Sequence, residues 1–119
     1  NINTIHGRAE DFGRDASYRE KYDIATSRAV ARLVVLLEYL LPVVKKDGIC
    51  ICMKSNKADE EIEEAQKALQ ILGGKIEKVE KFNLPGTDNE RSIIIVRKIK
   101  STPKNYPRKA GIPAKKPLI

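Results

Sequence analysis

Apolar residues in the first half of the chain follow a strand pattern and then a helix pattern, with a polar break between them. A short apolar run, Ile24-Ala25-Thr26, predicts a buried strand, and Ser27-Arg28 interrupts it. Strand, polar break and helix is the repeating unit of an open α/β sheet, whose ligands bind at the carboxyl ends of the strands. Beyond the break, apolar residues recur at helical spacing until Pro42 ends the run: Ala29, Val30, Leu33, Val34, Leu37, Leu40 and Leu41.

A second strand and helix follow. Residues 45–48 predict a turn whose glycine suits a positive φ, and residues 49–53 are apolar on both faces, as in a central parallel strand. Lys54 comes directly after this strand, again on the ligand side of the sheet. Residues 58–72 predict a helix with acids in its first turn, where the macrodipole favours them, and Gly73-Gly74 ends it.

The remaining strands predict a hairpin. Residues 75–84 alternate between apolar and charged, which fits a half-exposed strand with a bulge, and residues 91–100 contain a buried apolar run. The short connection between them predicts antiparallel pairing. A parallel sheet that ends in an antiparallel hairpin is typical of the second half of a class I methyltransferase (Rossmann-like) sheet. We therefore predict this α/β fold over residues 1–100.

Composition sets the size and chemistry of the chain. Its 119 residues suffice for one domain with an aliphatic core, since aromatics make up 5% and there is no Trp. No apolar run has transmembrane length and no signal peptide is visible, which favours the cytoplasm. Cys50 and Cys52 alternate on one strand and lack neighbouring ligands, so we expect two buried thiols without a disulfide and no metal site.

Positive charge is concentrated at the end of the chain. The formal net charge is +7, and residues 101–119 supply +5 of it without a single acid. This segment also holds Pro103, Pro107, Pro113 and Pro117, so we expect a basic Pro-rich tail with little regular structure. A basic tail on a nearly neutral domain indicates a polyanionic partner, and the alternative is a solubilising tail.

The sequence contains no glycine-rich nucleotide loop. A nucleotide-binding α/β domain needs such a loop after its first strand. The chain begins at Asn1 and enters at once into residues 2–6, which predict a strand. We therefore expect a fragment whose first βα units lie upstream, and we expect the strand at residues 2–6 to be loosely held or paired with another chain.

Five motifs, in order along the whole chain, carry a resemblance to a known family. They are HGRAEDF at 6–12, YDIATSRAVARL at 22–33, GICICMK at 48–54, FNLPGTDNERSIIIVRKIK at 82–100 and TPKNYPRKAGIPAKKP at 102–117. Together they make the chain resemble the RsmG (GidB) family. The resemblance implies an S-adenosylmethionine-dependent methyltransferase that acts on guanine N7 of bacterial 16S ribosomal RNA, in naked form or in the small ribosomal subunit.

The resemblance also assigns residues. Ala9, Glu10 and Arg28 match donor-binding positions of the family. Glu10 would accept hydrogen bonds from a ribose or adenine amine, or else is a surface acid. Arg28 is a fixed cation suited to a carboxylate or phosphate, or else it caps a helix or pairs with Asp23 or Glu10. Because the family's glycine-rich loop has no counterpart here, we expect this chain alone to be inactive.

Further residues are candidates for RNA binding. Lys54, by its place at the end of the central strand, would meet RNA phosphate or lie in solvent. The tail residues Lys104, Arg108 and Lys109 would neutralise phosphates, and Tyr106 would stack on a base. His6, the one histidine, is expected to be structural.

The lack of an acid–base pair does not conflict with methyl transfer. Guanine N7 carries a lone pair and no proton, so displacement at a sulfonium methyl needs alignment more than a general base. Two alternatives from other classes stay open. One is a non-catalytic RNA-binding module with a basic tail. The other, a nicotinamide-dependent oxidoreductase, is disfavoured by the terminal hairpin.

Overall fold

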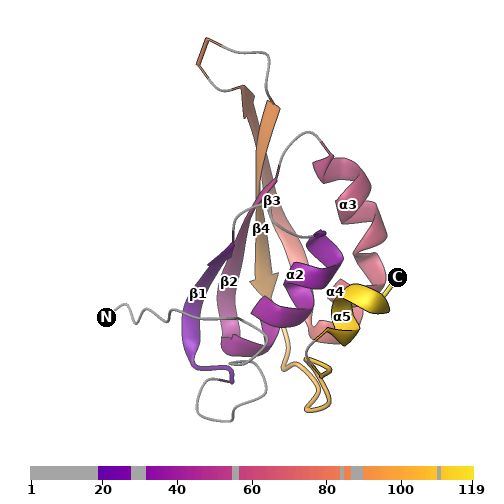
Figure 1. Cartoon of the computed structure of the whole chain (residues 1–119). Coiled ribbons are helices and arrows are strands. Elements are labelled where there is room, and N and C mark those ends of the chain that lie inside the picture. Colours follow the sequence, from indigo (N-terminus) through magenta and orange to yellow (C-terminus); the bar gives the residue numbers. More distant parts are fainter. Residues whose placement is uncertain (1–18, 28–31, 55–56, 84, 87–89, 110) are drawn as a thin grey trace.

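The computed structural model describes residues 19–27, 32–54, 57–83, 85–86, 90–109 and 111–119. They form a four-stranded sheet with helices on one side (Figure 1). The strands are β1 (Tyr22–Ser27), β2 (Val44–Lys54), β3 (Gly74–Asn83) and β4 (Glu90–Lys98), in the order β1-β2-β4-β3. The helices are α2 (Leu33–Leu40), α3 (Ala58–Glu64), α4 (Gln66–Leu72) and α5 (Ile112–Lys115), and a 3₁₀ turn, η1 (Leu41–Val43), follows α2.

The direction of the strands changes once across the sheet. β1 and β2 are parallel, whereas β2 with β4 and β3 with β4 are antiparallel. The predicted hairpin and its bulge are confirmed, because the β3–β4 register shifts between Ile76 and Lys78. The predicted α/β sheet ending in an antiparallel hairpin is therefore confirmed for the described residues. The strand expected at residues 2–6 lies outside them.

The prediction that Ile24-Ala25-Thr26 forms a buried strand is wrong on burial. β1 forms as expected, but Ile24 is 49% exposed. Within the described part of the chain β1 pairs with β2 alone and is therefore an edge strand. The short apolar run identified the strand correctly because strand propensity is a local property. The burial of the strand depends on which elements lie beside it in the folded chain.

The turn predicted at residues 45–48 is also wrong. These residues belong to β2, and the β1–β2 register shifts beside them, between Tyr22 and Ile24. Asp47, not the glycine, takes the positive φ of 73°. Gly48 is needed for a different reason, since an added Cβ would lie 2.6 Å from the carbonyl oxygen of Asp23.

The core lies between α2 and the helix-facing side of the sheet. Every residue of α2 is buried, including the polar Glu38 and Tyr39. Residues 28–31, where the sequence predicts the start of this helix, lie outside the described residues. The helix predicted over residues 58–72 is divided at Ala65 into α3 and α4, and α4 ends at Gly73, whose φ of 89° is the left-handed cap expected there. None of the described helices is long and apolar enough to cross a membrane.

A buried lysine at the end of β4 is hydrogen-bonded to the backbone of the 3₁₀ turn η1 and the start of β2. Lys98 is fully buried, and its Nζ donates hydrogen bonds to the carbonyl oxygens of Leu41 at 2.6 Å and Val44 at 2.9 Å. A carboxylate oxygen of Glu20 lies 3.3 Å away. Burial lowers the pKa of Lys98, although the Glu20 charge opposes this effect.

Residues 101–119 pack onto the fold, and among the described residues their regular structure is limited to the four-residue helix α5. The hydroxyl of Thr102 donates to the Leu72 carbonyl oxygen at 2.6 Å, and its backbone N–H donates to Glu20 at 2.9 Å. Arg19 donates to the carbonyl oxygen of Tyr106. Proline-rich sequence argued against regular structure, yet Pro113 occupies the first turn of α5, where its missing N–H has no cost.

Candidate functional site

The carboxyl ends of β1 and β2 meet at one edge of the sheet. The two strands are parallel and Ser27 pairs with Cys52, so both strands end within about two residues of each other. We call this region the carboxyl edge, defined by Ser27 and Lys54 as the last residues of the two strands. Open α/β sheets bind their ligands at such an edge.

Lys54 lies inside the carboxyl edge and not in solvent. Its side chain is 5% exposed, and Nζ lies 2.9 Å from Oε1 of Glu61 in α3. The sequence suggested a contact with RNA phosphate or with water. The structure instead pairs this cation with a carboxylate that is itself 18% exposed.

Glu61 joins three elements at this edge. The same Oε1 accepts a hydrogen bond of 2.7 Å from the backbone N–H of Leu33, the first residue of α2. The first N–H groups of a helix have no partner within it, and the negative charge also favours the positive end of the helix. A second link lies beside it, where Arg32 NH2 is 2.6 Å from Glu64. α3 thereby fixes the start of α2, which directly follows residues 28–31.

Sequence reasoning did not identify Glu61 or Glu64 as site residues. The acids at the start of the helix over residues 58–72 were explained by its own macrodipole. That explanation is local, whereas Leu33 and Lys54 reach Glu61 only in the folded chain. The acidic run was the visible signal, but one sequence does not show which cation or N–H it faces.

A buried serine stands opposite Lys54. Ser92 of β4 pairs with Lys54 in the sheet register and is 1% exposed. Its Oγ is the buried side-chain atom of the described residues that has no hydrogen-bond partner. The carboxyl edge therefore contains a cation, a carboxylate and a hydroxyl on the helix-facing side of the sheet.

The two cysteines are free and fully buried, as predicted. Burial raises the pKa of Cys52 to about 12 and raises that of Cys50 further. A thiol is a nucleophile or a metal ligand only as thiolate, so these residues behave as small apolar side chains. No cluster of three or more potential metal ligands occurs among the described residues.

The donor-binding candidates are not placed by the structure. Ala9, Glu10 and Arg28 lie outside the described residues, as does His6. Their assignments stay predictions. The described part of the chain locates only the strand end from which Arg28 follows, namely Ser27 at the carboxyl edge.

The tail candidates divide into two groups. Lys104 and Lys109 are exposed, as the RNA-binding prediction requires. Tyr106 is partly buried against the core. Arg108 is in a two-pronged ion pair with the buried Glu38, with Nε and NH2 at 3.0 and 2.8 Å from its two oxygens.

The tail and the carboxyl edge lie at opposite ends of β4. Ser92 is paired with Lys54 near one end, and Lys98 precedes the tail at the other. Six residues of strand span roughly 20 Å at 3.3–3.4 Å per residue. This distance applies to the start of the tail, because Arg108 lies further back along α2, beside Glu38.

Parallel strands that end together beside a polar cluster, followed by an antiparallel hairpin, define this chain as part of a methyltransferase-type α/β sheet. Comparison with known proteins makes the assignment specific. Residues 1–94 match the family model GidB, rRNA small subunit methyltransferase G. The chain belongs to this family.

Individual members of this family match almost the whole chain in sequence. It is 53% identical to ribosomal RNA small subunit methyltransferase G of Lactobacillus helveticus over 118 residues, which is 99% of this chain and 49% of that protein. It is 56% identical to the protein of the same name from Acetivibrio thermocellus, covering 98% of this chain and 48% of that protein. The chain thus spans about half the length of the curated relatives it matches.

Among solved structures, the chain is similar to a 16S rRNA N2 G1207 methyltransferase (RsmC) of T. thermophilus, solved with AdoMet and guanosine. The TM-score is 0.47 and the identity 14%, over 71% of this chain and 22% of that chain.

Proposed function

We propose that this chain forms part of an S-adenosylmethionine-dependent methyltransferase acting on guanine N7 of 16S ribosomal RNA. The observation that carries the proposal is the family match over residues 1–94, supported by more than 50% identity to named methyltransferases along nearly the whole chain. The substrate is the RNA itself or the small ribosomal subunit. Ala9, Glu10 and Arg28 are the proposed contacts to the methyl donor.

The chemistry of the carboxyl edge fits this donor. S-adenosylmethionine supplies a methyl group on a sulfonium, which N7 of guanine can accept without losing a proton. The described edge offers Lys54 and Glu61, already bound to each other, and no free acid–base pair. Such an arrangement suits a reaction that depends on alignment and exclusion of water.

Lys54 and Glu61 act in this proposal as positioning residues. Their ion pair, with the Leu33 N–H, holds β2, α3 and the start of α2 together. The segment that carries Arg28 is bounded by Ser27, the last residue of β1, and by Arg32, the residue before α2. The orientation of Arg28 toward the donor then depends on the Glu61 contacts.

The alternative is a non-catalytic RNA-binding module. The exposed tail lysines and the net charge of +7 favour RNA binding in either case. Methyl transfer to RNA is expected if the chain is part of a methyltransferase and is not expected if it is a non-catalytic RNA-binding module.

A chimera tests them. The segment of the Lactobacillus helveticus relative that this chain matches is replaced by this chain, and the product is incubated with labelled S-adenosylmethionine and unmethylated small-subunit RNA. We expect label in 7-methylguanosine, identified by mass spectrometry of the digested RNA. The relative with the matched segment deleted is the control and should transfer none. A folded chimera that binds RNA but transfers no methyl group would support the module instead.

A further inference from the structure

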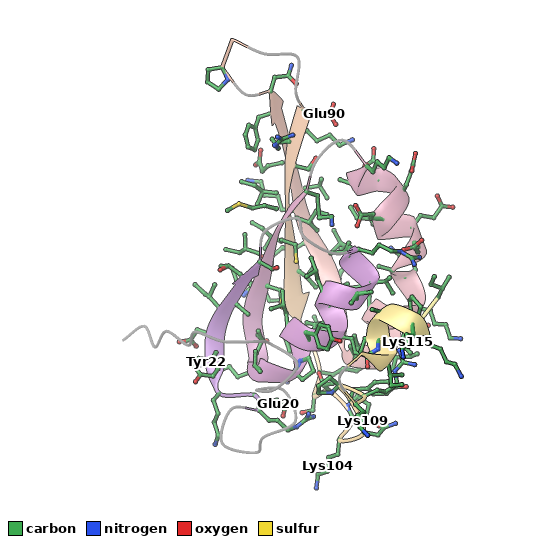
Figure 2. All side chains as sticks on the ribbon, viewed as in Figure 1. Glu20, Tyr22, Glu90, Lys104, Lys109 and Lys115 are labelled. Carbon is green, nitrogen blue, oxygen red and sulfur yellow. The ribbon has the colours of Figure 1, made fainter. Side chains whose placement is uncertain are left out.

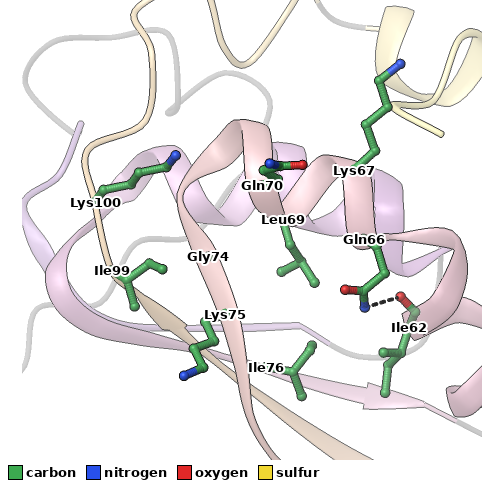
Figure 3. A pocket seen from close by; sticks show the side chains of 10 residues that line it. All are labelled: Ile62, Gln66, Lys67, Leu69, Gln70, Gly74, Lys75, Ile76, Ile99 and Lys100. Atoms are coloured by element: carbon green, nitrogen blue, oxygen red, sulfur yellow. Dashed lines mark hydrogen bonds between the residues drawn. The ribbon is translucent and has the colours of Figure 1, made fainter.

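A pocket lies at the end of the molecule opposite the carboxyl edge. It is open, has a volume of about 740 Å³ and lies between α4, the start of β3 and the residues that follow β4. Lys67, Lys75 and Lys100 line it from these three elements (Figure 3). We call it the lysine pocket, after these three residues.

The lining of the lysine pocket has a particular chemistry. Its lining combines three lysines with aliphatic side chains that include Leu69 and Ile76, and the amide of Gln70 adds a neutral donor and acceptor; the lysine side chains extend outward from the aliphatic residues (Figure 3). None of the described residues that line the pocket is an acid. The site is therefore electropositive, with a low-polarity floor.

The lysines of the pocket differ from the other cations of the hairpin. In the part of the chain that the structure describes, the ammonium groups of Lys67, Lys75 and Lys100 make no hydrogen bond or ion pair. By contrast, three hairpin cations are neutralised by neighbouring carboxylates at 2.5–2.8 Å: Lys78 by Glu80, Lys81 by Asp59 and Arg97 by Glu77. Positive charge on this side of the molecule is thus available at the pocket and compensated along the hairpin.

The exposed charges of the tail extend the same region. Lys104, Lys109 and Lys115 lie at the end of the molecule where β4 leaves the sheet and the pocket is found (Figure 2). Arg108, by contrast, is occupied by Glu38. The tail thus adds exposed cations at the same end of the molecule as the pocket.

We propose that the lysine pocket binds the phosphodiester backbone of the RNA substrate, roughly 20 Å from the carboxyl edge by the length of β4. The inference rests on the proposed function for the identity of the polyanion. Lysines contact phosphates as point charges without reading sequence, and the aliphatic floor accepts the face of a sugar or base. The pocket therefore anchors the RNA at a place distant from the target guanine.

Substitution of the three lysines tests the inference. Lys67→Gln, Lys75→Gln and Lys100→Gln are combined, and binding of a fluorescently labelled 12-nucleotide single-stranded RNA is followed by anisotropy between 50 and 300 mM KCl. Each phosphate contact contributes about 0.7 to the slope of log affinity against log salt. We expect the slope to decrease by about 2, with affinity lower by roughly tenfold to 100-fold at 0.1 M salt.

A matched variant removes the same charge elsewhere. Lys45→Gln, Lys78→Gln and Lys81→Gln are combined, because these lysines are paired with Asp23, Glu80 and Asp59. It should keep a slope close to that of the unmutated chain. Circular dichroism confirms that both variants are folded.

The outcomes separate this inference from the proposed function. If the unmutated chain binds RNA and the pocket variant keeps its slope, the pocket assignment is wrong and the function stands. Equal losses in the two variants would also reject the pocket, since net charge alone would then explain binding. If the unmutated chain does not bind the RNA, both the binding of RNA at the lysine pocket and the contribution of this chain to RNA binding in the proposed function are rejected.

Discussion

One carboxylate oxygen of Glu61 accepts hydrogen bonds from two elements of the site. It faces Nζ of Lys54 and the N–H of Leu33, and both contacts are shorter than 3 Å. A neutral amide at this position would still accept the N–H but would no longer offset the buried ammonium. At the scale of single residues, this oxygen is the point on which the geometry of the carboxyl edge depends.

The first prediction concerns this residue. Glu61→Gln should lower the free energy of unfolding by about 1–3 kcal/mol, because a buried charged group loses its charged partner. Urea unfolding measures the loss. Glu60→Gln, an exposed acid one position earlier, is the control and should change stability by less than about 0.5 kcal/mol. Equal effects of the two substitutions would contradict the bridging role.

The second prediction concerns thiol reactivity. Because burial raises the pKa of Cys52 to about 12 and that of Cys50 further, both thiols stay protonated at pH 8. We expect a disulfide exchange reagent to modify neither cysteine in the folded chain, and both in guanidinium chloride. Thiolate forms only as the pH rises toward the raised pKa, so native reactivity should appear above about pH 11, if folding persists there.

A positive control accompanies the thiol measurement. Lys78→Cys introduces a third thiol at a position whose side chain is 61% exposed. This thiol should react at once at pH 8 in the folded protein. Rapid modification of Cys50 or Cys52 under the same conditions would show that β2 is not buried as the structure has it.

At the scale of elements, the segment after β4 belongs to the fold as much as the helices do. Glu38 in α2 is 1% exposed, and Arg108 supplies its main compensating charge. The backbone N–H of Arg108 and its guanidinium both donate to this carboxylate. Deleting residues 101–119 would therefore disturb α2 as well as any contact with RNA, so point substitutions are the better test of the tail.

The third prediction follows from this ion pair. Arg108→Met should lower the free energy of unfolding by about 3–5 kcal/mol, because it leaves the buried carboxylate uncompensated. Urea denaturation measures the change, and Lys109→Met, at an exposed position, should have little effect. Combining Arg108→Met with Glu38→Met should recover much of the loss, since an apolar pair can replace a buried ion pair. A double variant as unstable as the single one would contradict this account.

The sequence allowed most of the helices and strands to be predicted, but not their burial, their place in the sheet or their side-chain partners. Alternation and helical spacing located β2, β4 and the hairpin, because those patterns record which face of an element is buried. The same patterns placed Ile24 in a buried strand and residues 45–48 in a turn, since neither edge position nor a register shift has a local signature. Arg108 was assigned to RNA because its charge is visible in the sequence, while its buried partner Glu38 lies 70 residues away.

At the scale of the whole molecule, the lysine pocket and the carboxyl edge are separated by the length of a strand. β4 carries Ser92 beside the edge and Lys98 beside the pocket, and it is hydrogen-bonded to β2 on one side and β3 on the other. An RNA that contacts both ends gains the second contact as an intramolecular event, at high effective concentration. Neither end needs high affinity by itself.

The fourth prediction concerns RNA length. About six stacked nucleotides, at 3.4 Å each, cover the separation of roughly 20 Å. We expect a 12-nucleotide single-stranded RNA to bind at least tenfold more tightly than a four-nucleotide RNA at 0.1 M salt, beyond the increase expected from its additional binding registers. The Lys67, Lys75 and Lys100 variant should lose most of this advantage. Affinities that rise smoothly with length, equally in both proteins, would contradict two separated contacts.

A strand that is hydrogen-bonded on both sides holds the two proposed binding sites at a fixed distance from each other. The distance along β4 is fixed by its hydrogen bonds to β2 and β3. In the proposed binding mode, the enzyme would favour an RNA in which the target guanine and a backbone segment are held at the corresponding distance. Folded RNA sets such distances by its tertiary structure, whereas an unfolded strand presents them only briefly. The proposed enzyme would thereby favour a correctly folded substrate over an unfolded one without reading the sequence at the distant contact.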